Sequence, residues 1–327
     1  MLASLLLTGL LLLAGVPGVP GAPGPALAAT PAPDAAAADT DPGQAQKVRH
    51  PERAPLLAAA RAGTRIVALG DFGIILLSDD DGASWRQAQS VPTRRTLTAV
   101  QFIDDRHGWI VGHNGTVLHT SDAGEHWRAL TSPDEDMALF SVSFDDPQHG
   151  LVVGAFGFAA RTDDGGASWE PFEVTDEDPH LYRIFHDAEG AIWIAAEMGF
   201  VFRSRDGLTF ETVEVPYTGS FWGGMKAPDD SLLLWGMSGT LLRSTDNGRS
   251  WRQTDTGTDN PITDACVTSD GRLILVGLSG TVLTSRDNAA TVHTEIRPDR
   301  RAYTSVIAID GRPLAFSLEG TENARQP

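Results

Sequence analysis

The stretch Thr120-Ser121-Asp122-Ala123-Gly124-Glu125-His126-Trp127 decides the fold, because variants of it return along the chain at a constant spacing. We call the pattern [Ser/Thr]-x-Asp-x-Gly-x-x-Trp an Asp-box. Further intact copies stand at 78–85, 162–169 and 244–251. Two degenerate copies lie at 204–210, which is one residue short, and at 285–292, where Ala289 replaces the glycine. The last residues of successive copies lie 41 or 42 positions apart, a period typical of propellers and solenoids.

A second motif, a [Gly/Ala/Ser]-x-x-Gly tetrad, precedes every Asp-box and adds a seventh repeat. The tetrads occupy 70–73, 112–115, 154–157, 196–199, 236–239, 277–280 and 317–320. Short β-type runs surround them, as at 97–103, 108–111, 116–120 and 126–130. One period therefore holds four strands separated by turns. This pattern predicts an all-β protein, a seven-bladed β-propeller with four-stranded antiparallel blades.

The seventh repeat is shorter than the others. Residues 303–309 and 313–317 supply two strands, and the chain then becomes polar from Glu322 onward. Missing strands leave sheet edges exposed, so we expect the N- and C-terminal segments to pair and close the ring. The stretch 46–57 is our candidate for the outermost strand. The propeller is thus predicted over residues 47–320, with a polar tail at 321–327.

The Asp-box residues suit a tight turn. Ser, Thr and Asp side chains bond to nearby backbone N–H groups, glycine supplies a positive φ, and Trp packs on a neighbouring apolar layer. An acceptor-rich turn uses its oxygens on its own backbone, so we predict a structural role and no metal. The residues in question are Asp80, Trp85, Asp122, Trp127, Asp164, Trp169, Asp246 and Trp251.

The N-terminus has a different composition. Residues 2–16 are rich in Leu and Ala, and Ala26-Leu27-Ala28 fits small-residue cleavage, although no basic residue precedes Lys47. This pattern predicts a signal peptide at 1–28 and a periplasmic or otherwise extracytoplasmic location. The Ala- and Pro-rich stretch 29–46 is predicted to be a disordered linker. No later run is apolar enough to span a bilayer, so no membrane insertion is expected after the signal is removed.

Composition excludes several functions. The 327 residues include 43 acidic and 25 basic side chains, and the net charge of −18 disfavours nucleic-acid binding. The single cysteine, Cys266, cannot form an intramolecular disulfide or a Cys-rich metal site. The histidines lack metal-ligand spacing. We therefore expect no metal and no cofactor.

The unit 108–127, together with 92–97, resembles the photosystem II assembly and stability factor-like propellers. The resemblance covers about residues 54–320. It implies a seven-bladed, non-enzymatic protein outside the cytoplasm that assists the assembly of a membrane complex. We accordingly expect a monomer whose partner is a protein, part of a membrane-associated complex.

In a propeller, the tetrads and the connections between blades open on one face, where binding residues are expected. Apolar residues inside the tetrads form a candidate binding collar of Phe72, Phe156, Met198, Met237 and Leu278. Basic candidates on the connections are Arg94, Arg95, Arg297, Arg300 and Arg301, and Tyr217 is a further contact candidate. Acidic runs at 134–136 and 176–178 make the face dipolar. The alternatives are that the apolar residues plug the channel mouth and that the charges are ordinary solvated loops.

A carbohydrate-active propeller, either a sialidase-like glycosidase or a lectin, is the alternative function. A sialidase needs a tyrosine nucleophile and an arginine cluster that binds the substrate carboxylate. The tyrosines are Tyr182, Tyr217 and Tyr303, and the stretch 182–185 only superficially matches a sialidase arginine motif. Blades of minimal length leave little loop for a substrate pocket. We therefore predict no enzymatic activity and no catalytic residues.

Overall fold

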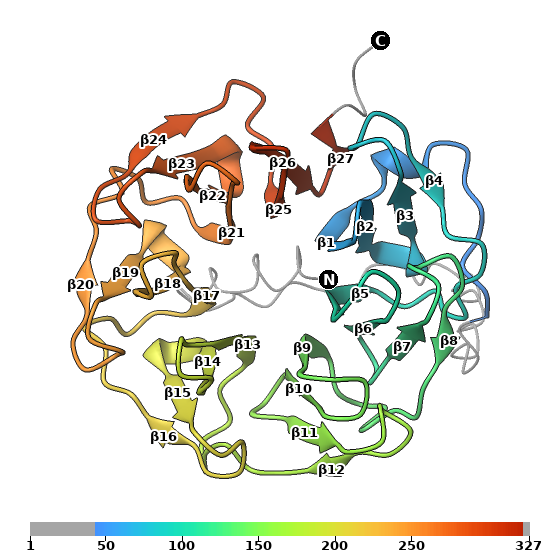
Figure 1. The fold of residues 1–327 in the computed structure, drawn as a ribbon, viewed down its shortest axis with the longest axis horizontal. Coiled ribbons are helices and arrows are strands. Elements are labelled where there is room, and N and C mark those ends of the chain that lie inside the picture. The colour runs from blue at the N-terminus through green and yellow to red at the C-terminus, as the bar shows by residue number, and fades with distance from the viewer. Residues whose placement is uncertain (1–42, 323–327) are drawn as a thin grey trace, which may run out of the picture. The chain divides into compact units, whose positions relative to one another are not determined.

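The computed structural model describes residues 43–322. The predicted signal peptide and most of the predicted linker lie outside the described residues, as does the end of the predicted tail from residue 323. Taken by itself, the described unit contains seven antiparallel sheets that follow one another around a central axis (Figure 1). The first strand of each sheet lies nearest the axis. The predicted seven-bladed β-propeller is confirmed.

Each of the first six blades has four strands. Blade 1 consists of β1 (Leu56–Ala62), β2 (Arg65–Gly70), β3 (Ile75–Ser78) and β4 (Arg86–Gln87). Blade 2 consists of β5 (Leu97–Phe102), β6 (Gly108–Gly112), β7 (Val117–Thr120) and β8 (Arg128–Ala129). Blade 3 consists of β9 (Leu139–Phe144), β10 (Gly150–Gly154), β11 (Ala159–Thr162) and β12 (Glu170–Pro171).

The second half of the ring repeats this order. Blade 4 consists of β13 (Leu181–His186), β14 (Ile192–Ala196), β15 (Val201–Ser204) and β16 (Glu211–Thr212). Blade 5 consists of β17 (Phe221–Lys226), β18 (Leu232–Gly236), β19 (Leu241–Ser244) and β20 (Arg252–Gln253). Blade 6 consists of β21 (Ile262–Val267), β22 (Leu273–Gly277), β23 (Thr281–Ser285) and β24 (His293–Ile296). Blade 7 consists of β25 (Tyr303–Ile309), β26 (Arg312–Ser317) and β27 (Gly320–Thr321).

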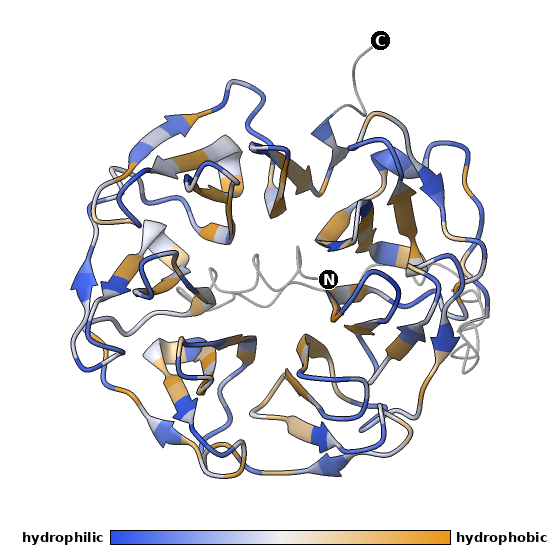
Figure 2. Ribbon diagram, viewed as in Figure 1, coloured by the Kyte–Doolittle hydropathy of each residue, from blue (hydrophilic) through white to orange (hydrophobic). Residues whose placement is uncertain are grey.

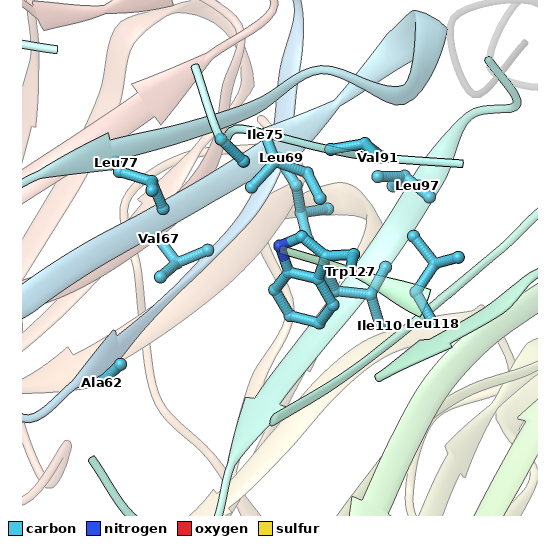
Figure 3. Packing of buried hydrophobic residues seen from close by; sticks show 11 residues of the cluster. Ala62, Val67, Leu69, Ile75, Leu77, Val91, Leu97, Ile110, Leu118 and Trp127 are labelled. Carbon is cyan, nitrogen blue, oxygen red and sulfur yellow. The ribbon is translucent and has the colours of Figure 1, made fainter. Parts of the chain in front are cut away.

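The core lies between the blades rather than within them. Seven apolar clusters occur, one between each pair of successive blades and one between blades 7 and 1. Figure 3 shows the Trp127 indole of the blade 2 Asp-box among residues of both blade 1 and blade 2. The second strands, such as β6 and β18, are buried along their whole length, whereas the outer strands β8 and β12 are exposed and polar (Figure 2). Burial on both faces explains the continuous apolar runs in the second strands.

The ring closes where the first and last blades meet, as predicted. β25 and β26 contact β1. The Thr304 hydroxyl donates to the Leu56 carbonyl at 2.6 Å, and Arg61 donates to the Ala308 carbonyl at 3.4 Å. An apolar cluster that includes Leu56 and Phe316 fills the space between blades 7 and 1.

The stretch 46–57 does not supply an outer strand, so that expectation was wrong. Within residues 43–322, the blade 7 sheet has only three strands. Residues Pro51–Arg53 form a 3-10 helix (η1) that contacts β27. Residues 45–48 lie along blade 1 instead, where Ala45 N–H donates to the Val91 carbonyl at 2.9 Å. Residues 51–55 cannot form an outer strand because they occupy the place of the connection between blade 7 and blade 1. The described residues of the predicted linker and tail are thus held against blades 1 and 7.

No helix in the described part of the chain is long and apolar enough to cross a bilayer.

Candidate partner-binding face

The tetrads join the second and third strands of each blade and bind two backbone segments at once. In blade 1, Asp71 N–H donates to the Pro55 carbonyl at 3.3 Å and Gly73 N–H donates to the Arg95 carbonyl at 3.1 Å. A Cβ on Gly73 would lie 2.0 Å from the Thr93 carbonyl oxygen, so only glycine allows this approach. The tetrads and the connections therefore form one continuous surface, which we call the tetrad face.

The third tetrad residue adopts the left-handed conformation in six blades. Asn114, Ser238 and Ser279 occupy it in blades 2, 5 and 6. In blades 1, 3 and 4 the residue is instead Phe72 (φ 58°), Phe156 (φ 54°) or Met198 (φ 57°). Bulky residues rarely adopt this conformation, which costs about 1–2 kcal/mol per residue. Such strain at an exposed loop is a reason to look for function there.

The predicted collar is exposed to solvent at four of its five residues. The exposed fractions are 68% for Phe72, 64% for Phe156, 55% for Met198 and 41% for Met237, and Leu278 is half-buried. Side chains that plugged a channel would be buried. Their exposure therefore favours a contact surface over a plug.

A feature that sequence reasoning missed is a β-bulge at the second residue of every inner strand. The pairing register shifts there in all seven blades. A bulge bends the strand and redirects its side chain. The bulged residues are Leu57, Thr98, Phe140, Tyr182, Trp222, Thr263 and Thr304. In the sequence these residues share one position in the repeat, directly after the first residue of the inner strand, and this shared position could have indicated the bulge.

The bulged residues divide the ring into two sides. On the threonine side, Thr98, Thr263 and Thr304 each donate to the first inner-strand carbonyl of the next blade, at 2.6 to 3.0 Å. On the aromatic side, the successive blades 3, 4 and 5 carry Phe140, Tyr182 and Trp222, all half-buried. The neighbouring Phe221 is fully buried in the core.

Four rings of blades 3 and 4 gather into what we call the aromatic corner: Phe140, Phe156, His180 and Tyr182. Ring centroids lie 5.6 Å apart for Phe140 and Tyr182, 4.9 Å for Phe156 and His180, and 6.1 Å for His180 and Tyr182. His180 Nδ1 accepts the Phe156 N–H at 3.0 Å, which leaves the neutral ring's proton on Nε2. Burial, with the nearby Glu197 charge, raises the pKa of the Tyr182 hydroxyl.

Three of the candidate arginines lie at the surface of the tetrad face. Arg94 is exposed and its Nε donates to the Gln44 carbonyl at 3.1 Å. Arg95 is half-buried and donates to the Asn114 carbonyl at 2.7 Å. Arg300 is exposed. These side chains give the surface of blades 1, 2 and 7 its positive charge.

Arg297 and Arg301, the other two candidate arginines, make contacts at the end of the described chain. Arg301 is only 7% exposed and donates to the Thr321 carbonyl at 2.9 Å. The Arg297 guanidinium lies 5.5 Å from the centre of the Tyr303 ring and bonds to Glu322. Within residues 43–322 β27 has no outer neighbour, so Arg301 satisfies its Thr321 carbonyl, and Arg297 holds Glu322, the residue that follows the strand.

Tyr217 supports the collar. Its hydroxyl donates to the Met237 carbonyl at 3.1 Å, and its ring lies 5.3 Å from the Phe221 ring. The half-buried Tyr217 side chain thus holds the blade 5 tetrad in position.

The Asp-boxes lie at the opposite end of the third strands from the tetrads. In blade 2, Thr120 Oγ1 donates to Asp122 Oδ1 at 2.9 Å and accepts from Gly124 N–H at 3.0 Å. Hydrogen bonds from the hydroxyl and the N–H of Ser168 lower the pKa of Asp164 to about 2. The carboxylate of each of these Asp-boxes thereby accepts hydrogen bonds from groups of its own turn. Across residues 43–322, no three His, Cys, Asp or Glu side chains converge as metal ligands would.

Two of the three tyrosines lack the surroundings that a glycosidase nucleophile requires. Tyr303 is fully buried. The raised pKa of Tyr182 is the opposite of what a nucleophile requires. Arg183, the cation next to it in the sequence, lies 3.7 Å from Asp264 in blade 6.

Comparison with known proteins gives one family and several propellers. The family model described as photosynthesis system II assembly factor YCF48 matches residues 77–143 and 130–217. The structure "YCF48 bound to D1 peptide" is similar, with a TM-score of 0.69 and 17% identity over 87% of this chain and 94% of that one. YCF48 from Cyanidioschyzon merolae has a TM-score of 0.66 and 16% identity over 85% and 96%.

An enzyme shares the architecture as well. Virginiamycin B lyase from Staphylococcus aureus has a TM-score of 0.72 and 11% identity over 82% of this chain and 93% of that one. None of the curated proteins matches this sequence. At these identities the solved structures show the fold alone. The family match confirms the resemblance to photosystem II assembly factors that the sequence predicts.

Proposed function

We propose that this chain, which resembles the photosystem II assembly factor YCF48, is a non-enzymatic exported propeller that binds a protein segment of a membrane-associated complex on its tetrad face. One of the similar structures is of YCF48 with a bound D1 peptide, which supports a polypeptide ligand here too. The predicted signal peptide supports export. In this role the protein acts as a monomer that assists assembly.

The exposed collar carries this proposal. Phe72, Phe156 and Met198 are more than half exposed and adopt a backbone conformation that small or polar residues fill at lower cost. Burial in the core does not explain them, because exposed side chains contribute little to the core. An exposed apolar set on one face is the property of a surface that binds another protein.

Site-specific photo-crosslinking in cells tests the proposal. A benzophenone amino acid would replace Phe72 or Phe156 on the tetrad face, and Arg249, which is exposed in the blade 5 Asp-box turn, would be the control position. We expect the two tetrad-face positions to capture the same membrane-associated protein and position 249 to capture none of it. Crosslinks only from 249, or release of a fluorogenic glycoside by the purified protein, would overturn the proposal.

A further inference from the structure

The aromatic corner lies beside acidic chain segments. The run 176–178 belongs to the connection between blades 3 and 4, and the Glu177 carbonyl oxygen lies 3.2 Å from where a Cβ of Gly157 would stand, next to Phe156. The carboxylate of Glu197, in the blade 4 tetrad, accepts the backbone N–H of His180 at 3.3 Å. The run 134–136 leads into β9, whose second residue is Phe140. The Glu197 carboxylate and the chain segments that carry the two acidic runs therefore adjoin the aromatic corner.

The protein's own cations do not neutralise these carboxylates. Within residues 43–322, no ion pair joins Glu197 or either acidic run to a basic side chain. Arg183 is the basic residue closest in sequence to the corner, and its guanidinium lies toward Asp264. The region is therefore negative and rich in ring faces.

We propose that the aromatic corner receives a basic side chain, arginine or lysine, of the partner polypeptide. This inference rests on the protein-binding role proposed above and names the chemistry of its ligand. A cation is attracted to the faces of aromatic rings within about 6 Å of their centroids. The surrounding carboxylates raise the local concentration of basic segments and orient them. A guanidinium has the further advantage that its plane stacks on a ring.

Other occupants fit less well. An apolar side chain would cover carboxylates without providing a counter-charge, and burying a charge without a partner is costly. An acidic segment would be repelled here and attracted to the opposite side of the face, where Arg94 and Arg300 are exposed. A basic side chain satisfies both the rings and the charges.

The two exposed phenylalanines provide a matched pair of variants. Phe156 and Phe72 occupy the same tetrad position, with exposed fractions of 64% and 68% and φ angles of 54° and 58°. The backbone of Glu177 adjoins Gly157, the residue after Phe156, whereas the backbone of Arg95 bonds to Gly73, the residue after Phe72. Replacing either ring by leucine keeps an apolar side chain and removes the ring face. Any difference between the two variants therefore reports the location of the cation site.

The probes are two short labelled peptides of apolar sequence, one with a central arginine and one with citrulline in its place. Citrulline has nearly the same shape and no charge. With the full-length chain we expect the arginine peptide to bind about ten-fold more tightly, equivalent to about 1.4 kcal/mol. Phe156→Leu should reduce this ratio toward one, whereas Phe72→Leu, which also alters the proposed collar, should weaken the binding of both peptides alike and leave the ratio unchanged. Tyr182→Leu is a second variant that should also reduce the ratio.

Equal binding of the two peptides, binding of neither, or a ratio that Phe156→Leu and Tyr182→Leu leave unchanged would overturn the cation site. Crosslinking of a membrane-associated protein from position 72 would in that case still support the proposed function. Loss of the crosslinks together with loss of peptide binding would instead reject both. The two failures are therefore distinguishable.

Discussion

The threonine side and the aromatic side of the tetrad face have the same backbone and use it differently. Both have a bulge at the second residue of the inner strand. At Thr98, Thr263 and Thr304 the bulged side chain donates a hydrogen bond to the next blade. At Phe140 and Tyr182 it carries a ring that stacks with its neighbour. The repeat fixes where the side chain stands, and the residue type decides whether it joins two blades or belongs to the proposed binding site.

The charges follow the same division. The aromatic side lies between the acidic runs 134–136 and 176–178, whereas Arg94 and Arg300 lie on the threonine side. Blades 7 and 1 are not linked through the described chain, so their contact depends on side chains such as Thr304. The hydrogen bonds that bulged residues donate to the next blade therefore lie on one side of the ring, and the proposed recognition site lies on the other.

The largest expected effect is a loss of stability on the threonine side. Thr304→Val removes a hydroxyl shared between the carbonyls of Leu56 and Phe316. An unsatisfied buried acceptor costs about 1–3 kcal/mol, so we expect the free energy of unfolding in urea to fall by about 2 kcal/mol. Tyr182→Phe, the control on the aromatic side, should change it by less than about 0.5 kcal/mol. Equal losses would remove the distinction between the two sides.

The collar should show a trade-off between stability and binding. Phe156→Asn relieves the left-handed strain and should raise the free energy of unfolding by about 1 kcal/mol while weakening partner capture. The reciprocal change, Asn114→Phe, should lower it by about the same amount. Thermal unfolding measured beside crosslinking yield checks both. A Phe156→Asn protein that is less stable than the parent would show that the ring contributes to packing.

A swap across the bulge positions tests whether the backbone is equivalent on both sides. Phe140→Thr places a hydroxyl where Thr98 stands in blade 2, and we expect it to donate to the Leu181 carbonyl. A hydrogen bond contributes about 0.5–1.5 kcal/mol, which offsets much of the lost ring packing. The net change in unfolding free energy should therefore stay within about 1 kcal/mol of zero. A crystal structure in which the hydroxyl lies elsewhere would contradict the equivalence.

The smallest expected effect on stability at neutral pH comes from His119 in blade 2, on the threonine side. His119 packs 4.8 Å from Trp109, and burial lowers its pKa from 6.5 to about 4. Between these values the unfolded chain binds a proton that the folded chain does not, so stability falls as the pH drops through this window. His119→Gln should flatten the dependence of the urea midpoint on pH from 6.5 to 4. An unchanged slope would show that other groups control it.

Part of the candidate site could be predicted from the sequence. The positions of Phe72, Phe156 and Met198 within the tetrads predicted their common face, because a constant period places equivalent residues at equivalent heights. The bulges could not be predicted, since they are set by pairing between strands. Nor could the burial of Arg301, which depends on how the chain end packs against a strand without an outer neighbour.

The amino-acid sequence by itself determined the number of blades, the glycines at close backbone approaches and the Asp-box turns, because each of these depends on residues close together in the chain. Only the tertiary structure decided that Phe140, Phe156, His180 and Tyr182 meet and that Thr304 joins blade 7 to blade 1. Those contacts unite residues from different repeats or from opposite ends of the chain. Ring closure brings them together, and no local pattern encodes their distance.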